Sequence, residues 1–345
     1  MVLRRLLPVV ITTALLALLL LSPRTFAQTA ATDIKLGSLA PSGSLWHDVL
    51  MQMGSTWKKV TDGRVGLRVY PGAQGDEVSL VRKMEIDQYQ AASLTVVGLQ
   101  RIDQAFNAFA IPLFYESQEE LVHVIGKLRP VMQERLAARK FQLLNFGYAG
   151  WVQVFSRAPI TSLDDLKRQK IYTSAGDDKM VQWYKARGYN PQPLAGTDVM
   201  LAIQTGLIDS MPVTPLAMVT FQWYKSAPNM LDIPLAPLVG ATIITQRAWN
   251  KISDADRTAL LQAARQAEDR MAVEVPKQDQ QSVAEMEKRG LKISRLRGTP
   301  QGAAFEAAAR EYGQSMRGEW VPVDIFDLAV KERDAFRAQR KTSSR

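Results

Sequence analysis

The clearest signal of the fold lies in residues 34–97. It begins with IKLGSLA, residues 34–40, where apolar and polar side chains partly alternate, as is typical of a strand. Apolar side chains then recur at helical spacing over residues 45–60, LWHDVLMQMGSTWKKV. A second strand is predicted at residues 65–70, a helix at residues 78–84 and an apolar strand at residues 91–97. This β-α-β-α-β order is typical of a mainly parallel sheet that is covered by helices.

The rest of the chain repeats this alternation and then becomes helical. Strands are predicted at residues 142–146 and 152–156, and short helices and strands alternate from there to residue 224. A strand at residues 241–245 follows, and a continuous helical pattern runs from Arg257 towards Gly290. A helix of that length is too long for one small domain. We therefore expect an α/β protein of two lobes with a long helix that bridges both.

The first residues have the layout of a secretory signal. Arg4 and Arg5 precede the apolar run Leu6–Leu21, and small residues then reach Ala27. The alternative is a permanent membrane anchor, but the run is on the short side for a span of roughly 20 apolar residues. We expect cleavage after Ala27, so that the mature chain lies in the periplasm.

The composition excludes several classes of function. The sequence contains no cysteine, which excludes disulfides and a cysteine-linked lipid anchor. Residues 1–27 carry three arginines and no acid, so their removal lowers the formal net charge from +9 to +6. The charges are interspersed, with no long basic run and no interleaved aromatic residues, so we expect no nucleic-acid partner.

The residue types that carry catalysis are not arranged for it. His47 and His123 have no second histidine or cysteine at metal-ligand spacing. The sequence contains neither a G-x-S-x-G nucleophile turn nor a G-x-x-x-x-G-K-[ST] phosphate loop. We therefore expect no catalytic residue, no metal and no cofactor, and a protein that binds a ligand rather than an enzyme.

Three motifs carry a resemblance to a known family. They are SLDDLKRQKI at residues 162–171, AIQTGLID at residues 202–209 and GDE at residues 75–77. In this order and at these spacings, the chain resembles the DctP-type solute receptors of tripartite ATP-independent periplasmic (TRAP) transporters. The resemblance implies a two-lobed periplasmic binding protein of the Venus flytrap type. Such a receptor closes on a small ligand and delivers it to a membrane permease driven by an ion gradient.

The resemblance and the strand pattern together suggest how the lobes divide the chain. We expect one lobe to contain residues 28–148 and 238–282, and the other to contain residues 149–237 and 283–345. The expected partners are a small-molecule ligand and the subunits of a TRAP permease, and we expect the receptor to be a monomer. Two alternatives stay open: a periplasmic interaction or sensing protein that uses the same fold without transport, and, less favoured, an enzyme.

Departures from the family pattern bear on the ligand. Tyr172 stands where the resemblance implies an arginine that clamps a carboxylate, and Trp151 stands at a second arginine position. The asparagine that often follows the second motif in the family is also missing, and residues 210–215, SMPVTP, stand there instead. An aromatic ring cannot form the two charge-assisted hydrogen bonds that arginine offers a carboxylate. We therefore expect a weakly polar, aromatic or lipid-like ligand rather than a dicarboxylate, unless Arg101 replaces the lost clamp.

The candidate ligand-binding residues lie mostly at predicted strand ends that face the cleft between the lobes. For each aromatic residue among them, simple core packing is the alternative interpretation. The candidates are Leu39, Trp46, Thr95, Val97, Tyr148, Trp151, Tyr172, Thr173, Met211, Val213 and Trp223.

Overall fold

A computed structural model of the chain describes residues 31–72 and 76–343. The predicted export signal, residues 1–27, lies outside the described residues. Among the helices that are described, none combines the length and the apolar character that crossing a membrane requires.

The first half of the molecule, called the first lobe here, contains the predicted β-α-β-α-β unit. Its elements are β1 (Thr32–Ser38), α2 (Leu45–Val60), β2 (Val65–Tyr70), α3 (Glu77–Glu85) and β3 (Ala91–Thr95). Strand β1 pairs in parallel with both β2 and β3, which confirms this part of the sequence prediction.

The strand predicted to reach residue 97 stops earlier, because the side chain of Thr95 accepts a hydrogen bond from Val97 N and caps a helix. That helix is α4 (Val96–Ile102), and it is followed by the 3-10 helix η1 (Gln104–Ala110) and by α5 (Gln118–Ala138).

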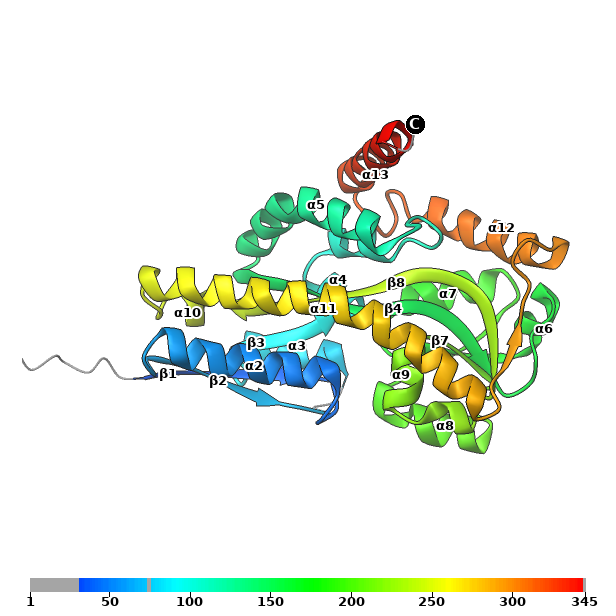
Figure 1. Cartoon of the computed structure of the whole chain (residues 1–345), viewed down its shortest axis with the longest axis horizontal. Helices are drawn as coiled ribbons and strands as arrows, with labels where there is room; N and C mark the ends of the chain where they lie inside the picture. Colours follow the sequence, from blue (N-terminus) through cyan, green and yellow to red (C-terminus); the bar gives the residue numbers. More distant parts are fainter. Residues whose placement is uncertain (1–30, 73–75, 344–345) are drawn as a thin grey trace, which may run out of the picture. The chain divides into compact units, whose positions relative to one another are not determined.

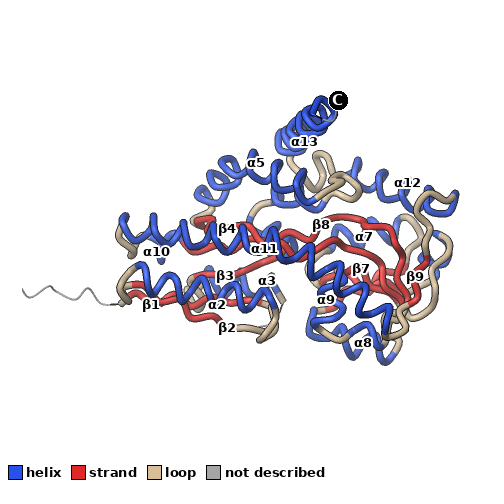
Figure 2. Tube along the Cα trace, viewed as in Figure 1, coloured by secondary structure: helices blue, strands red, loops and turns tan. Residues whose placement is uncertain are grey.

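Two long strands run through the centre of the molecule (Figure 2). They are β4 (Phe141–Ser156) and β8 (Asn229–Thr245), and they pair antiparallel over most of their length. The prediction of separate strands at residues 142–146 and 152–156 was wrong, because both belong to β4. A bulge between Tyr148 and Trp151 joins them, with Gly150 at a φ of +99°.

The second half, called the second lobe here, continues the same sheet. Its elements are α6 (Leu163–Arg168), β5 (Lys170–Ser174), α7 (Asp178–Ala186), β6 (Asn190–Leu194), the 3-10 helix η2 (Gly196–Asp198), α8 (Val199–Thr205), β7 (Ser210–Val213), α9 (Pro215–Thr220) and the 3-10 helix η3 (Trp223–Lys225). The short strand β9 (Lys292–Ser294) pairs in parallel with the start of β8.

In the described part of the chain, nine strands form one sheet in the order β2-β1-β3-β8-β4-β7-β5-β6, with β9 beside β8. The pairs within each lobe that involve β1 or β5 are parallel, as expected, but β3–β8, β8–β4 and β4–β7 are antiparallel. The expectation of a mainly parallel sheet was therefore wrong at the centre. The long central strands run in opposite directions because each carries the chain from one lobe to the other.

The predicted bridging helix is present as α11 (Asp254–Lys288), which crosses the molecule in Figure 1. Ser253 caps its start by accepting a hydrogen bond from Asp256 N. The helix contacts α2 in the first lobe, β4 at the centre and α9 in the second lobe. The remaining helices are α10 (Gln246–Trp249), α12 (Pro300–Ser315) and α13 (Val323–Ser343), and α13 packs on α5.

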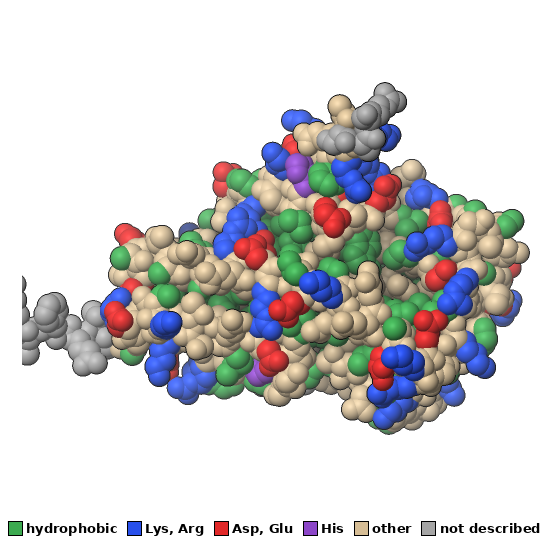
Figure 3. Space-filling view, in the orientation of Figure 1, with side chains coloured by type: hydrophobic (Ala, Val, Ile, Leu, Met, Phe, Trp, Pro, Cys, Tyr) green, Lys and Arg blue, Asp and Glu red, His purple; other side chains and the backbone are tan. Residues whose placement is uncertain are grey.

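The buried apolar side chains form separate clusters in the two lobes. The first cluster surrounds the strands of the first lobe and includes Trp57, Phe106 and Phe146. The second includes Phe155 and Met211 and lies among β7, α8 and the end of α11. On the face shown in Figure 3, acidic and basic side chains are interspersed, in keeping with the sequence pattern. A third cluster includes Val154, Leu231 and Phe305, and the first extends to Leu216 on α9 and to residues of α12 and α13. Strands β4 and β8 and helix α11 connect the two lobes.

Candidate functional site

A cavity of about 180 Å³ lies where β1, β3, β4 and β8 meet α9 and α11. We call it the interlobe cavity, because its lining comes from both lobes and from the elements that connect them. The lining residues are Ser38, Leu39, Ala40, Trp46, Leu50, Glu77, Ser93, Leu94, Thr95, Gly147, Tyr148, Ala149, Ala217, Phe221, Leu238, Val239, Gly240, Ala241, Thr242 and Met271. Most of these side chains are apolar, so the cavity suits a ligand with an apolar body.

Four of the residues selected from the sequence line this cavity: Leu39, Trp46, Thr95 and Tyr148. The indole Nε1 of Trp46, on α2, donates a hydrogen bond of 3.2 Å to the backbone carbonyl of Tyr148, on β4. This bond satisfies the only polar atom of the indole and leaves its flat apolar faces for packing. The Tyr148 hydroxyl is buried and has no hydrogen-bond partner among the described residues, and burial raises the pKa of Tyr148 well above its usual value.

The two aromatic residues at the expected arginine positions are half-buried and lie outside this lining. Trp151 packs against the first cluster, and its backbone N–H donates to the Asp279 carboxylate at 3.0 Å. Tyr172 packs against the second cluster, with its hydroxyl 3.4 Å from Ser174 Oγ. Burial raises the pKa of Tyr172, and the charge of Glu77 adds to this rise.

The other candidates occupy three kinds of position. Met211, Val213 and Trp223 are buried members of the second cluster. Thr173 is buried on β5, and its hydroxyl has no hydrogen-bond partner within the described part of the chain. Val97 is half-buried in the first turn of α4, where its N–H donates a hydrogen bond to the side chain of the capping residue Thr95. Arg101, the possible replacement clamp, is exposed on α4 and lies outside the cavity lining.

Glu77 is the functional candidate that sequence reasoning missed, although it lies in the GDE motif. It is the first residue of α3, and Asp76 caps that helix by accepting a hydrogen bond of 2.6 Å from Ser79 N. Glu77 is only 6% exposed, yet it contributes to the cavity lining. Burial raises the pKa of Glu77, against the opposing effect of hydrogen bonds from Thr95 and Gly98.

Phe221 and Met271 also line the cavity without having been selected. Phe221 follows α9 and stacks on Trp223, with ring centroids 4.6 Å apart and planes 13° from parallel. Phe221, Trp223 and Tyr224 are close together in the sequence, but the sequence does not show which of these rings faces the cavity.

The two lobes touch each other beside the cavity. Gln100, on α4, lies near Asp177, which follows β5, and its side chain lowers the pKa of that carboxyl group. Burial raises the pKa of Asp177 to about 6. A Cβ atom at Gly176 would lie 2.7 Å from the side chain of Val78, on α3. These contacts show that the described conformation has its lobes closed upon one another on this side of the cleft.

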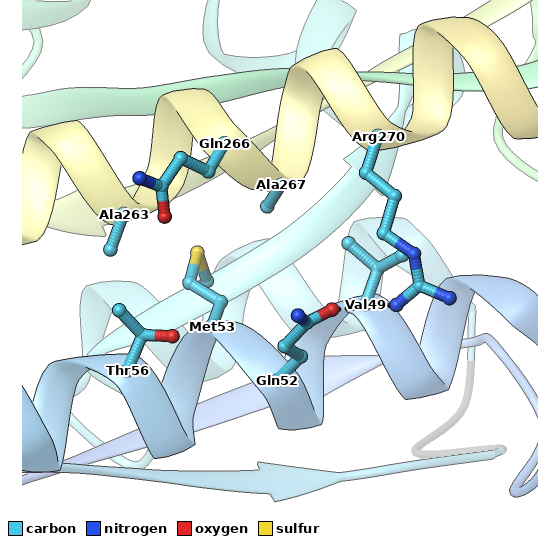
Figure 4. A pocket seen from close by; sticks show the side chains of 8 residues that line it. All are labelled: Val49, Gln52, Met53, Thr56, Ala263, Gln266, Ala267 and Arg270. Atoms are coloured by element: carbon cyan, nitrogen blue, oxygen red, sulfur yellow. Dashed lines mark hydrogen bonds between the residues drawn. The ribbon is translucent and has the colours of Figure 1, made fainter.

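A second cavity, of about 140 Å³, lies between α2 and α11 (Figure 4). Arg270 points into it, but the guanidinium already pairs with Glu274 at 2.8 Å and donates to Gln52 Oε1 at 2.7 Å. The cavity therefore offers no free positive charge to an anionic ligand. None of the residues selected from the sequence lines it. In the described residues, no three potential metal-binding side chains of histidine, cysteine, aspartate or glutamate gather at one place.

Known proteins share this architecture. A solute-binding protein of Roseobacter denitrificans is 27% identical over 300 residues, which cover 85% of this chain and 88% of that protein. The sialic acid-binding periplasmic protein of Vibrio cholerae is 22% identical over 270 residues, which cover 77% and 83% of the two chains.

A solved structure shows the same fold. The TRAP periplasmic solute-binding protein of Xanthobacter autotrophicus, with bound β-D-galacturonate, gives a TM-score of 0.80 at 18% identity. The superposition covers 87% of this chain and 99% of that protein. This confirms the two-lobed α/β architecture that the sequence predicted.

The family itself follows from the sequence match. Residues 36–319, nearly the whole described part of the chain, match the family model of the DctP proteins. The family's members are solute receptors for transport rather than enzymes. The chain therefore belongs to the DctP family, the bacterial extracellular solute-binding proteins of family 7.

Proposed function

We propose that this protein is the periplasmic receptor of a TRAP transporter and that it captures a weakly polar, aromatic or lipid-like ligand. The receptor acts as a monomer after removal of residues 1–27, catalyses no reaction, and delivers the ligand to the permease. The observation that carries the proposal is the interlobe cavity, whose lining is largely apolar and contains neither arginine nor lysine among the described residues.

The proposed lobes are residues 28–148 with 238–282 and residues 149–237 with 283–345. The first cluster surrounds the strands of the first lobe, and the second contains Phe155 and Met211, which supports the division for most of residues 28–237. Residues 312–329 pack into the first cluster, so the last part of the chain does not follow this division. A ligand held between the lobes would make contacts with both only in the closed state, and would therefore favour closure. The family membership supports handover to a membrane permease.

The chemistry of the lining supports a ligand without a free carboxylate. The sialic acid-binding relative and the galacturonate-bound structure are named for acids. In this chain, however, Glu77 is the only formally charged residue among the described residues that line the cavity. A carboxylate buried beside it would lose its hydration without gaining a cationic partner, at a cost of several kcal/mol. Burying the aromatic or aliphatic surface of a ligand carries no such desolvation cost.

A thermal-shift screen tests the proposal. Galacturonate, sialic acid and succinate should leave the unfolding temperature unchanged, whereas neutral aromatic and lipid-like compounds should raise it by mass action. The variants Trp151→Ala and Tyr172→Ala serve as comparisons, because these residues stand where carboxylate clamps are expected. Stabilisation by the acids that is retained in both variants would contradict the proposal.

A further inference from the structure

The carboxylate of Glu77 is held in a fixed position at the wall of the interlobe cavity. Its Oε1 accepts a hydrogen bond of 2.9 Å from Thr95 N. Its Oε2 accepts bonds of 2.7 Å from Gly98 N and 2.8 Å from the Thr95 hydroxyl. Gly98 also leaves room for it, since a Cβ atom there would lie 2.9 Å from Oε2. The end of β3 and the start of α4 thus form a cradle built around this one side chain.

The cradle leaves acceptor capacity unused. An ionised carboxylate has about four lone-pair positions, and these three donors fill three of them. The remaining position is on Oε1, which carries a single bond. Because the side chain lines the cavity, a hydrogen-bond donor on a ligand is a suitable partner for that position.

No positive charge of the described residues balances this carboxylate. Glu77 takes part in hydrogen bonds only with uncharged groups, and the charged neighbour that most affects it is Asp76, another acid. Burial disfavours the ionised form of Glu77, and a cation in the cavity would favour that form by supplying the missing counter-ion.

Aromatic rings from three elements line the same cavity. Trp46 comes from α2, Tyr148 from β4 and Phe221 from the end of α9. The face of an aromatic ring attracts an ammonium group, most strongly when water is excluded. The rings therefore favour the same sign of charge as Glu77 does, while they also supply apolar surface for the body of a ligand.

We infer that Glu77 makes the interlobe cavity selective for an organic ammonium ion, an amine attached to an apolar or aromatic body. The protonated amine donates to Glu77 Oε1, and the body packs among Trp46, Phe221 and the aliphatic residues of β8. This inference rests on the proposed function and narrows its ligand class. It assigns to Glu77 the role of a specificity-determining residue.

Three probes with one common body test the inference: 2-phenylethylamine, 2-phenylethanol and 3-phenylpropionate. Thermal shift and calorimetry on the mature chain should rank the amine first, the alcohol at least about tenfold weaker in Kd, and the acid without effect. Glu77→Gln should remove the advantage of the amine over the alcohol. Glu85→Gln, an exposed position on the same helix, should preserve it.

The outcomes separate this inference from the proposed function. Equal binding of amine and alcohol, with the acid excluded, overturns the role of Glu77 and leaves the weakly polar ligand in place. Preferred binding of 3-phenylpropionate overturns both. No response to the amine up to its solubility limit also overturns the inference, and the wider screen then decides the proposed function. These wild-type comparisons stand even if Glu77→Gln does not fold.

Discussion

Replacing Asp279 with alanine should lower the free energy of unfolding by about 2–4 kcal/mol, because two buried backbone donors lose their acceptor. Asp279 lies on α11 and is 8% exposed. Its Oδ2 accepts from Trp151 N at 3.0 Å, at the bulge of β4, and its Oδ1 accepts from Leu216 N at 2.9 Å, in the first turn of α9. One carboxylate therefore connects the bridging helix to a central strand and to a cavity-lining helix.

Urea unfolding measures this loss, and Asp269→Ala is the matched control. Asp269 lies on the same helix but is exposed, so its replacement should change stability by no more than about 0.5 kcal/mol. Because α9 carries the lining residue Ala217, ligand binding should weaken in Asp279→Ala as well. Equal stability of the two variants would show that the Asp279 contacts do not hold these elements together.

Because the pKa of the Asp279 carboxyl group is shifted, we expect an unusual dependence of stability on pH. Burial raises the pKa of Asp279 from 3.8 to about 6, although the two N–H donors oppose the rise. The folded state therefore holds the proton more tightly than the unfolded chain does. The stability that this group contributes is full below about pH 4 and is lost as the pH rises through about 6. The deficit of Asp279→Ala relative to wild type should be larger at about pH 5 than at about pH 7.

Replacing Arg129 with methionine should cost about 3–5 kcal/mol, because it leaves a buried carboxylate without its main counter-ion. Arg129, on α5, is 9% exposed and pairs with Glu268, on α11. Its guanidinium also lies 4.8 Å from the ring centroid of Phe146, on β4. Glu268 Oε2 accepts a bond of 2.9 Å from Phe146 N, so the pair connects α5, β4 and α11 inside the first lobe.

A surface pair gives the control for this substitution. Arg310 pairs with Glu306 four residues away on α12, and the Arg310 side chain is 57% exposed. Arg310→Met should therefore change the free energy of unfolding by about 0.5 kcal/mol or less. The double variant Arg129→Met, Glu268→Gln should recover part of the loss, since no unpaired charge remains buried and the amide oxygen still accepts from Phe146 N. If Arg129→Met behaves like Arg310→Met, the buried pair does not stabilise the first lobe.

Elements with strong periodicity could be predicted from the sequence. Helix α2 begins and ends at the predicted residues, and α11 differs from its prediction by a few residues at each end. In both, apolar or helix-favouring residues recur over several turns, so the local signal is long.

Strand β6 and residues 229–240 of β8 were not predicted, because they lack such a signal. Pro191 and Pro193 interrupt β6, and Pro234 and Pro237 interrupt β8, so both segments resemble loops in sequence.

The candidate site could be predicted only where it depends on strand ends. Leu39, Thr95 and Tyr148 follow from the alternation of strands and helices in the first lobe. The lining from Leu238 to Thr242 depends on β8 running through the centre, which no local pattern shows. Glu77 acquires its role from Thr95 and Gly98, some twenty residues away in sequence, through the packing of α3 on α4. Such pairings are tertiary, and single-sequence patterns do not encode them.

We propose that the interlobe cavity receives a ligand without a free carboxylate. Mass spectrometry of the small molecules released from the protein, after purification under native conditions from the cells that make it, is the decisive test of this claim. We predict about one equivalent per chain of a compound with an apolar body and a neutral or positively charged polar group. One equivalent of a sugar acid, a sialic acid or a C4-dicarboxylate would contradict the claim.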